Sequence, residues 1–359
     1  IPVYQRYYSW DIDQCKRLWN DIVEMQKKGK TGHFVGSIVN IAEQAMPTGV
    51  QKFMIIDGQQ RTTTLTLLLL ALRDYAIANP ADTTINAKRI DNMLLKNEYE
   101  SGDERYKLLL TETDRDILIS LIESKPIADG TKSKLLDNYK YFVGKIADQE
   151  LSPAEIYESI GKLQIVNITL DRTMDDAQAI FESLNSTGKE LSESDLIRNY
   201  VLMGLEPTEQ TYVYEHMWRP MELMFSYETQ DTLMDKFFRD YLTMKLTRIP
   251  KQGRVYDEFK LYHLNCEFST IRELCQDLLT YAKYYTDIVF VRSSNPVLKG
   301  LYSDINDLRM EVSYPFLIKV HNDYGEHIIT EDELLEILRL CISYVFRRSI
   351  CDIPTNSLN

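Results

Sequence analysis

The stretch IIDGQQRTTTLTLLLLALRDYAIAN, residues 55–79, decides the fold of the N-terminal part of this chain. Its first apolar run ends at Asp57-Gly58, which predicts a buried β-strand over 52–56. The apolar residues after the three threonines cover most faces of a helix that ends near Asn79, so this helix is expected in the centre of a domain. A polar turn that contains a glycine therefore joins two buried elements.

The turn has the parts of an anion-binding site. The first backbone N–H groups of a helix have no intrahelical partner and carry partial positive charge. Gly58 lets a ligand approach the backbone closely, and the Arg61 guanidinium can hold phosphate oxygens with two hydrogen bonds. Thr62 and Thr63 add hydroxyl donors. The turn therefore suits a phosphate-bearing ligand.

The other polar residues of the turn suit metal and water chemistry. Asp57 could hold Mg²⁺, which prefers carboxylate and phosphate oxygens. Gln59 and Gln60 could orient a water molecule or read a base. A purely structural explanation stays open, because Asp57 could simply cap the helix and the residues up to Arg61 could form a solvated first turn. The GxxxxGK[ST] spacing of a P-loop is missing.

Length and charge set broader limits on function. The 359 residues exceed one ordinary core, so two domains are expected. A net charge of −13 argues against a surface that is basic all round. The first 73 residues hold nine Lys/Arg and six Asp/Glu, so an anionic ligand is expected there rather than in the remainder. Chance unevenness of a solvated surface explains this excess equally well.

Cysteines and apolar runs indicate a cytosolic protein. The five cysteines are scattered and form no CxxC pair, which predicts reduced thiols and no zinc site. The longest unbroken apolar run, Leu67 to Leu72, is far too short to span a bilayer. The chain starts at Ile1 without a signal-like segment, as expected of a trimmed chain.

Hydrophobic spacing predicts an α+β protein in two parts. Residues 1–8 should be extended, and Asp11 and Gln14 should form the capping box of a helix that ends near Gly29. Strands are expected over 33–41 and 163–170, and helices over 86–98, 112–123, 132–148, 153–161, 175–184, 192–205, 229–246, 269–290, 301–321 and 331–349. Glu206-Pro207 divides a small α/β domain, 1–205 with a helical insertion at about 80–160, from a helical domain, 206–359.

Four motifs occur in one order: IPVYQRYYSW at 1–10, HFVGSIV at 33–39, IIDGQQRTTTL at 55–65 and FESLNSTGKELSESDLIRNY at 181–200. Together they resemble the N-terminal domain of GmrSD-type modification-dependent restriction proteins, catalogued as domain of unknown function 262. The resemblance covers about residues 1–205 and, weakly, the rest through YVFRRSICDIPTNSLN at 344–359. It implies a ParB/sulfiredoxin-like α/β fold and a role in defence against phage or modified foreign DNA.

The resemblance also implies that a nucleoside triphosphate is bound and hydrolysed around the DGQQR motif, and Mg²⁺ dependence is expected with it. Arg61 and Arg6 would stabilise charge on the phosphates. Asp57 would hold the metal ion or a water, and Gln60 would position the attacking water. The remaining nucleotide-binding candidates, from the IPxYQR, DGQQR and LNxxG motifs, are Gln5, Gly58, Gln59, Thr62, Thr63 and Asn185.

Each of the outlying candidates also has a structural explanation. Arg6 could pair with an acid on a surface strand, and Asn185 with Gly188 could form a turn for backbone reasons alone. Asp195 and Arg198, three residues apart on a helix, could pair with each other. The aromatic residues of the first motif, which could stack on bases or pack into the core, are Tyr4, Tyr7, Tyr8 and Trp10.

Many proteins that this chain resembles carry a His-Asn-His nuclease module. The five histidines of this chain show no such arrangement, so the 359 residues are not expected to cleave DNA. The nuclease either follows Asn359 in a longer protein or is absent from this member. Three classes stay open: an NTPase that gates a DNA-targeting system, a nucleotide or modified-DNA sensor without turnover, and a helical scaffold. No membrane partner is expected, and the acidic helical part is compatible with a homo-oligomer.

Overall fold

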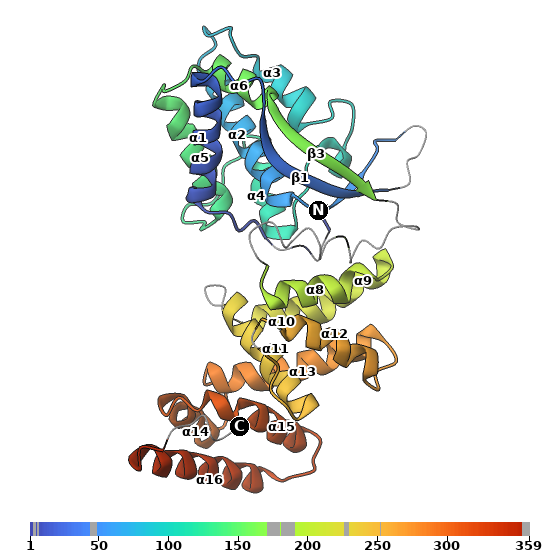
Figure 1. Ribbon diagram of the computed structural model, residues 1–359, viewed down its shortest axis with the longest axis vertical. Coiled ribbons are helices and arrows are strands. Elements are labelled where there is room, and N and C mark those ends of the chain that lie inside the picture. Colours follow the sequence, from blue (N-terminus) through green and yellow to red (C-terminus); the bar gives the residue numbers. More distant parts are fainter. Residues whose placement is uncertain are drawn as a thin grey trace. The chain divides into compact units, whose positions relative to one another are not determined.

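The computed structural model describes residues 1–2, 5, 7–43, 49–170, 180, 191–225, 230–251 and 253–353. The chain forms two compact units, Ile1–Leu184 and Asn185–Asn359. The first unit contains helices and a small sheet and the second is helical, which confirms the predicted α+β class (Figure 1). Helix α8 (Glu193–Met203) packs against helices of the second unit.

A three-stranded sheet forms the β part of the first unit, in the order β2 (Phe53–Asp57), β1 (His33–Ala42), β3 (Leu163–Leu170). Strand β1 pairs antiparallel with β2 and parallel with β3, and all three strands were predicted. The pairing of β1 with β3 is irregular between Phe34 and Gly36, where Gly36 has φ +116°. Glycine adopts this backbone conformation without the steric cost that other residues carry.

Five helices supply the core of the first unit: α1 (Ile12–Lys27), α2 (Gln59–Ala78), α4 (Glu112–Ile122), α5 (Lys134–Ala147) and α6 (Pro153–Gly161). Helix α1 starts at the predicted capping box of Asp11 and Gln14. Helix α2 is buried over most of its length, as its apolar sequence predicts, and it packs on α5 (Figure 1). The predicted helix at 86–98 is shorter: α3 (Ala87–Ile90) runs into a π-helical turn that ends at Leu95.

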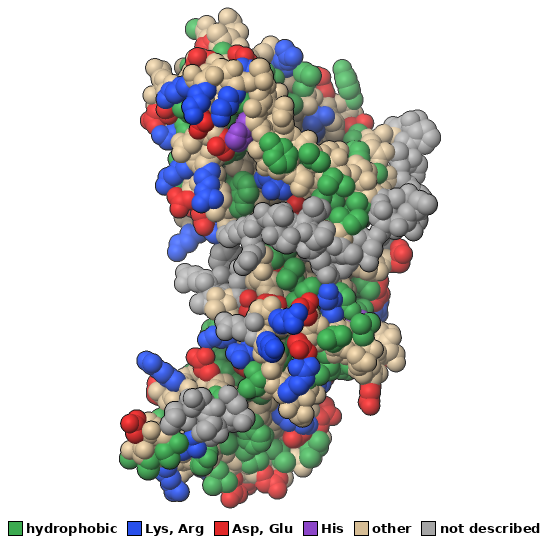
Figure 2. All heavy atoms as spheres, viewed as in Figure 1, with side chains coloured by type: hydrophobic (Ala, Val, Ile, Leu, Met, Phe, Trp, Pro, Cys, Tyr) green, Lys and Arg blue, Asp and Glu red, His purple; other side chains and the backbone are tan. Residues whose placement is uncertain are grey.

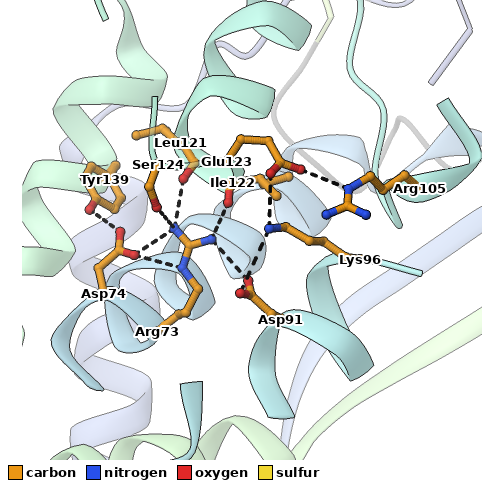
Figure 3. A network of polar contacts seen from close by, with 10 residues as sticks. All are labelled: Arg73, Asp74, Asp91, Lys96, Arg105, Leu121, Ile122, Glu123, Ser124 and Tyr139. Carbon is orange, nitrogen blue, oxygen red and sulfur yellow. Dashed lines mark hydrogen bonds and ion pairs between the residues drawn. The ribbon is translucent and has the colours of Figure 1, made fainter. Parts of the chain in front are cut away.

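A buried arginine fixes helix α2 against α4 (Figure 3). Arg73 is 1% exposed, and its guanidinium donates to the backbone oxygens of Leu121 and Ile122 at 2.8 and 2.6 Å. These are carbonyl groups of the last turn of α4, which have no partner inside that helix. The same guanidinium pairs with Asp74 and Asp91. This network holds the axis of α2, and with it the position of its N-terminal turn.

Helices make up the described part of the second unit: α8, α9 (Pro207–Val213), η3 (Tyr214–Trp218), α10 (Arg219–Met224), α11 (Gln230–Leu246), α12 (Val255–Asn265), α13 (Ile271–Val289), α14 (Pro296–Asp307), η4 (Glu311–Ser313), α15 (Tyr314–Gly325) and α16 (Glu331–Ile350). The single helix predicted over 301–321 is wrong, because the chain turns at Arg309, which has φ +51°, and divides it into α14 and α15. Asp195 and Arg198 pair at 2.5 Å, as predicted.

Among the first eight residues, those that the structure describes do not form the strand-like extended segment that was predicted. Their described residues, 1–2, 5 and 7–8, belong to no strand, and the Gln5 N–H donates to the oxygen of Pro2 at 3.1 Å, which makes a turn. No helix among the described residues combines the length and apolar character needed to cross a membrane.

Candidate functional site

The turn between β2 and α2 is built around Gly58. This residue has φ +93° and precedes the first residue of the helix. A Cβ atom here would lie 2.9 Å from the backbone oxygen of Ser37 and from Cγ1 of Ile38, so strand β1 leaves no room for a side chain. Both the backbone angle and the contact therefore require glycine. The chain turns sharply enough here to start a helix directly at the end of β2.

The first turn of α2 presents unpaired backbone donors. The Thr62 N–H donates to the oxygen of Gly58 at 3.0 Å and is the first to follow the helical pattern. The N–H groups of Gln59, Gln60 and Arg61 precede it and have no acceptor within the helix. The helix dipole adds partial positive charge at this end. This is the geometry expected of an anion site.

Arg61 lies at this positive end with part of its hydrogen-bonding capacity unused. Its Nη2 donates to the oxygen of Ser37 at 2.5 Å and to Oδ2 of Asp57 at 3.2 Å. The guanidinium occupies the space that a side chain at Gly36 would fill, since a Cβ there would be 3.1 Å from its carbon Cζ. Its Nε is buried and has no hydrogen-bond partner among the described residues, yet the side chain is 25% exposed. The guanidinium is thus reachable and incompletely satisfied.

Gln60 holds the C-terminal part of the first motif, residues 7–10. Its Oε1 accepts hydrogen bonds from the N–H groups of Ser9 and Trp10 at 2.8 and 3.3 Å. Its Nε2 donates to the oxygen of Tyr7 at 3.2 Å. Both ends of the amide are therefore bound to backbone. The predicted role in positioning water stays a prediction, and it would require at least one of these bonds to open.

The hydroxyl groups of the threonines turn inward. Thr62 and Thr63 donate to the backbone oxygens of Gly58 and Gln59, four residues earlier in the helix, at 3.1 and 2.8 Å. Such bonds are common for threonine inside helices. Each hydroxyl oxygen keeps only acceptor capacity for a ligand. Gln5 is also engaged, because its Nε2 donates to the oxygen of Ile56 in β2 at 3.1 Å.

A half-buried carboxylate that the sequence analysis missed lies beside the same helix turn. Asp114, in α4, accepts a hydrogen bond from the Tyr8 N–H at 2.6 Å. Together with Gln59 and Thr63 it lines a cavity of about 10 Å³, room for about one water molecule. Burial raises the pKa of the Asp114 carboxyl to about 6, against the opposing effect of the Tyr8 hydrogen bond. No spacing relates α4 to the DGQQR motif, so sequence gave no signal for this contact.

Two asparagines place amides on the face of the sheet where Arg61 lies. The Asn40 side chain donates to Oδ1 of Asn167 at 2.6 Å, and Oδ1 of Asn40 is buried without a partner. Because alternate strand residues share a face, Asn40 lies on the same side as Gly36, over which the Arg61 guanidinium sits. The sequence contained a signal for this pair of asparagines. The tetrapeptide IVNI occurs both at 38–41 and at 165–168, and asparagine is rare within strands.

Much of the positive charge near the N-terminus is neutralised by ion pairs. Lys28 and Lys30 both pair with Glu24, at 2.9 and 2.8 Å, and Lys27 pairs with Glu150 at 2.9 Å. On the face of the molecule in Figure 2, Lys/Arg and Asp/Glu side chains are interspersed. The excess of basic residues in the first fifth of the chain therefore does not act as a free basic patch, and Arg61 stands out by its surroundings.

The residues around the turn offer little for a metal ion by themselves. Among the described residues no group of three or more His, Cys, Asp or Glu side chains could hold a metal. Asp57 is a single carboxylate, 26% exposed, and one of its oxygens pairs with Arg61. Mg²⁺ is often held by one or two carboxylates together with ligand phosphates, so Asp57 fits a metal that arrives with a nucleotide. Arg6 and Asn185, also predicted at this site, lie outside the described residues.

The class of protein follows from the fold and the site. It has a small α/β unit, in which the central helix starts at a glycine turn beside a reachable arginine, and the chain continues into helices. Residues 1–202 match the family described as GmrSD restriction endonuclease, N-terminal domain. This match covers more than half of the chain, so the chain belongs to that family. The family gives it a role in a restriction system, and therefore an involvement with DNA. No curated protein matches the chain.

Proposed function

We propose that the β2–α2 turn binds a nucleoside triphosphate together with Mg²⁺, and that its hydrolysis regulates a DNA-targeting restriction system. The observation that carries this proposal is the state of Arg61. A guanidinium at the start of a helix, 25% exposed and bonded to the described residues through Nη2 alone, is suited to receive phosphate oxygens. The membership in a restriction family supplies the cellular setting.

The geometry assigns different tasks to the residues of the motif. Gly58 and the free N–H groups after it form the backbone part of the site, and Arg61 supplies the charge. Asp57 would exchange its bond to Arg61 for the metal ion once phosphate occupies the guanidinium. Gln60 acts by holding residues 7–10 against α2. In this arrangement Gln60 is a positioning residue.

A sensor without turnover is the second candidate, and one observation favours it. The cavity beside the motif measures about 10 Å³. The amide of Gln60 and the hydroxyl groups of Thr62 and Thr63 are hydrogen-bonded to backbone atoms. No group of the motif is thus poised to activate a water as the chain stands. Binding of a nucleotide without hydrolysis would need fewer of these bonds to open.

Nucleotide binding and phosphate release by the purified chain test the proposal. The four NTPs are offered with Mg²⁺ to the wild type, to Arg61→Ala and to Arg17→Ala. Arg17 is an exposed arginine of α1 in the same unit, so its substitution is the matched control. Loss of charge-assisted hydrogen bonds should weaken binding to Arg61→Ala by about 10- to 100-fold, while Arg17→Ala stays within about twofold of the wild type.

The results separate the candidates. Phosphate release that depends on Arg61 supports the NTPase. Binding that depends on Arg61 without release above background supports the sensor and removes the hydrolytic step. If the wild type neither binds nor hydrolyses any NTP, or if the two variants behave alike, the turn is not a nucleotide site and the family's motif is here a structural feature.

A further inference from the structure

The helical unit contains a pocket that is separate in sequence and structure from the β2–α2 turn. It measures about 230 Å³, more than the roughly 150 Å³ that accommodates benzene in an engineered protein cavity. Helix α11 and the η4 turn contribute the charged side chains that line it, which are Lys236, Arg239, Asp240 and Glu311. Ile249 and Val312 add apolar wall. A concave site with apolar walls and a few converging polar groups is the usual form of a small-molecule site.

Asp240 is the unusual member of this lining. It is half-buried and makes no hydrogen bond or ion pair with any residue that the structure describes. Burial raises the pKa of its carboxyl to about 7, and the nearby charge of Arg239 only partly opposes this. A desolvated carboxylate without a partner is costly, and perturbed carboxyl groups of this kind gather at functional sites. A ligand with a positive group would remove the cost.

The remaining charges of the pocket define the rest of the ligand. Nζ of Lys236 pairs with Oε2 of Glu311 at 3.0 Å, so these two charges cancel. The exposed guanidinium of Arg239 makes no hydrogen bond or ion pair with the described residues and lines the same pocket. One carboxylate, Asp240, and one guanidinium, Arg239, are left without an ion pair among the described residues. A ligand that carries one charge of each sign satisfies both, whereas a simple cation or anion leaves one unmatched.

We propose that this pocket binds a small zwitterion of amino-acid size, with its ammonium group on Asp240, its carboxylate on Arg239 and a short aliphatic chain along Ile249 and Val312. An ammonium group provides up to three donors to the Asp240 carboxylate. Arg239 can hold a carboxylate with two parallel hydrogen bonds. The site is independent of the nucleotide proposal, because no residue of the DGQQR motif takes part.

Calorimetric titration with three matched probes tests this site at pH 8. Norvaline carries both charged groups, butylamine lacks the carboxylate and pentanoate lacks the ammonium. We expect measurable binding of norvaline and at least tenfold weaker binding of the other two. Asp240→Asn should weaken norvaline binding at least tenfold. Asp304→Asn, an exposed carboxylate on α14, is the control and should change it less than twofold.

A pH series on the wild type gives a readout that does not depend on the variant. The charged and titratable groups near Asp240 are Lys236 and Arg239 from α11, Glu311 from η4, Tyr285 from α13 and Tyr314 from α15. Only the ionised carboxylate holds an ammonium, so norvaline affinity should fall about tenfold between pH 8 and pH 6. Equal affinity for norvaline and butylamine, no binding of any probe, or unchanged binding to Asp240→Asn would each overturn the proposal.

Discussion

Two arginines of helix α2, twelve residues apart, have opposite surroundings. Arg73 is 1% exposed, and its guanidinium is surrounded by two carboxylates and two backbone oxygens (Figure 3). Arg61 is 25% exposed, makes one bond to a backbone oxygen and one to a carboxylate, and keeps a buried Nε without a partner. The same residue type on the same helix thus occurs once with its donors matched and once with a donor unmatched among the described residues.

The comparison teaches that the number of matched hydrogen-bond donors distinguishes a structural arginine from a candidate binding arginine better than residue type or burial alone. A buried guanidinium whose donors are matched stabilises the fold and has nothing left for a ligand. A reachable guanidinium with an unmatched donor carries a cost that a bound anion would remove. The C-terminal half of α2 is therefore expected to govern stability, and its first turn is expected to govern binding.

The largest expected effect comes from the same substitution made at both arginines. Arg73→Met removes the guanidinium that pairs with Asp74 and Asp91 and that donates to the Ile122 carbonyl, so the free energy of unfolding should fall by about 3 kcal/mol or more. Arg61→Met breaks a partly exposed ion pair and should cost less than about 1 kcal/mol. Urea unfolding followed by circular dichroism measures both. Equal losses at the two sites would break the comparison.

Glycines test whether the first turn of α2 is rigidly built. At Gly58 a methyl group would need the strained φ +93° and would meet the backbone of β1 at 2.9 Å, so Gly58→Ala should destabilise by about 2–3 kcal/mol. Gly29 also has positive φ, +60°, but a Cβ there meets nothing within 4 Å. Gly29→Ala should therefore cost only about 1 kcal/mol.

The difference between these two alanine variants isolates the contact from the backbone angle. Thermal unfolding of each, at equal concentration and pH, is a sufficient measurement. If Gly58→Ala proved as mild as Gly29→Ala, strand β1 would have to yield at this point, and the turn would be adaptable rather than preformed.

The sequence predicted the elements whose pattern is local. The apolar runs on either side of Asp57-Gly58 were enough to place β2 and α2, and the alternation in residues 163–170 was enough for β3. What local pattern could not supply was the partner of each polar group. Gln60 reads as a free amide in the sequence, yet it binds the backbone of residues 7–10, about fifty positions earlier.

The candidate site was predicted in its location and only partly in its composition. Asp57, Gly58 and Arg61 lie together as the motif requires. Asp114 reaches the same turn from α4 through tertiary packing, which leaves no trace in spacing along the chain. The turn at Arg309 was missed for a related reason: its left-handed backbone carries no glycine or asparagine to signal it.

The smallest expected effect is on the pH dependence of stability, which should have opposite signs for the groups near the two ends of α2. Although burial alone would raise the pKa of Glu123, in the Arg73 network, the hydrogen bond from Arg105 and the charge of Lys96 lower it. Its contribution to stability is thus present above its ordinary pKa and is lost as pH falls. Burial raises the pKa of Asp114, beside the first turn, from 3.8 to about 6. The folded state binds that proton more tightly, so stability falls as pH rises between about 4 and 6.

Asp114→Asn keeps the acceptor for the Tyr8 N–H and removes the titration. The free energy of unfolding of the variant relative to the wild type should therefore be about 1 kcal/mol higher at pH 7.5 than at pH 4.5. This is less than the full pKa shift would give, because the carboxyl is partly exposed. Asp116→Asn, an exposed residue of the same helix, should show no such difference. Urea unfolding at both pH values measures each variant. A gain of equal size at the two pH values would mean that the Asp114 carboxyl is already solvated, and that the first turn of α2 is more open than its contacts indicate.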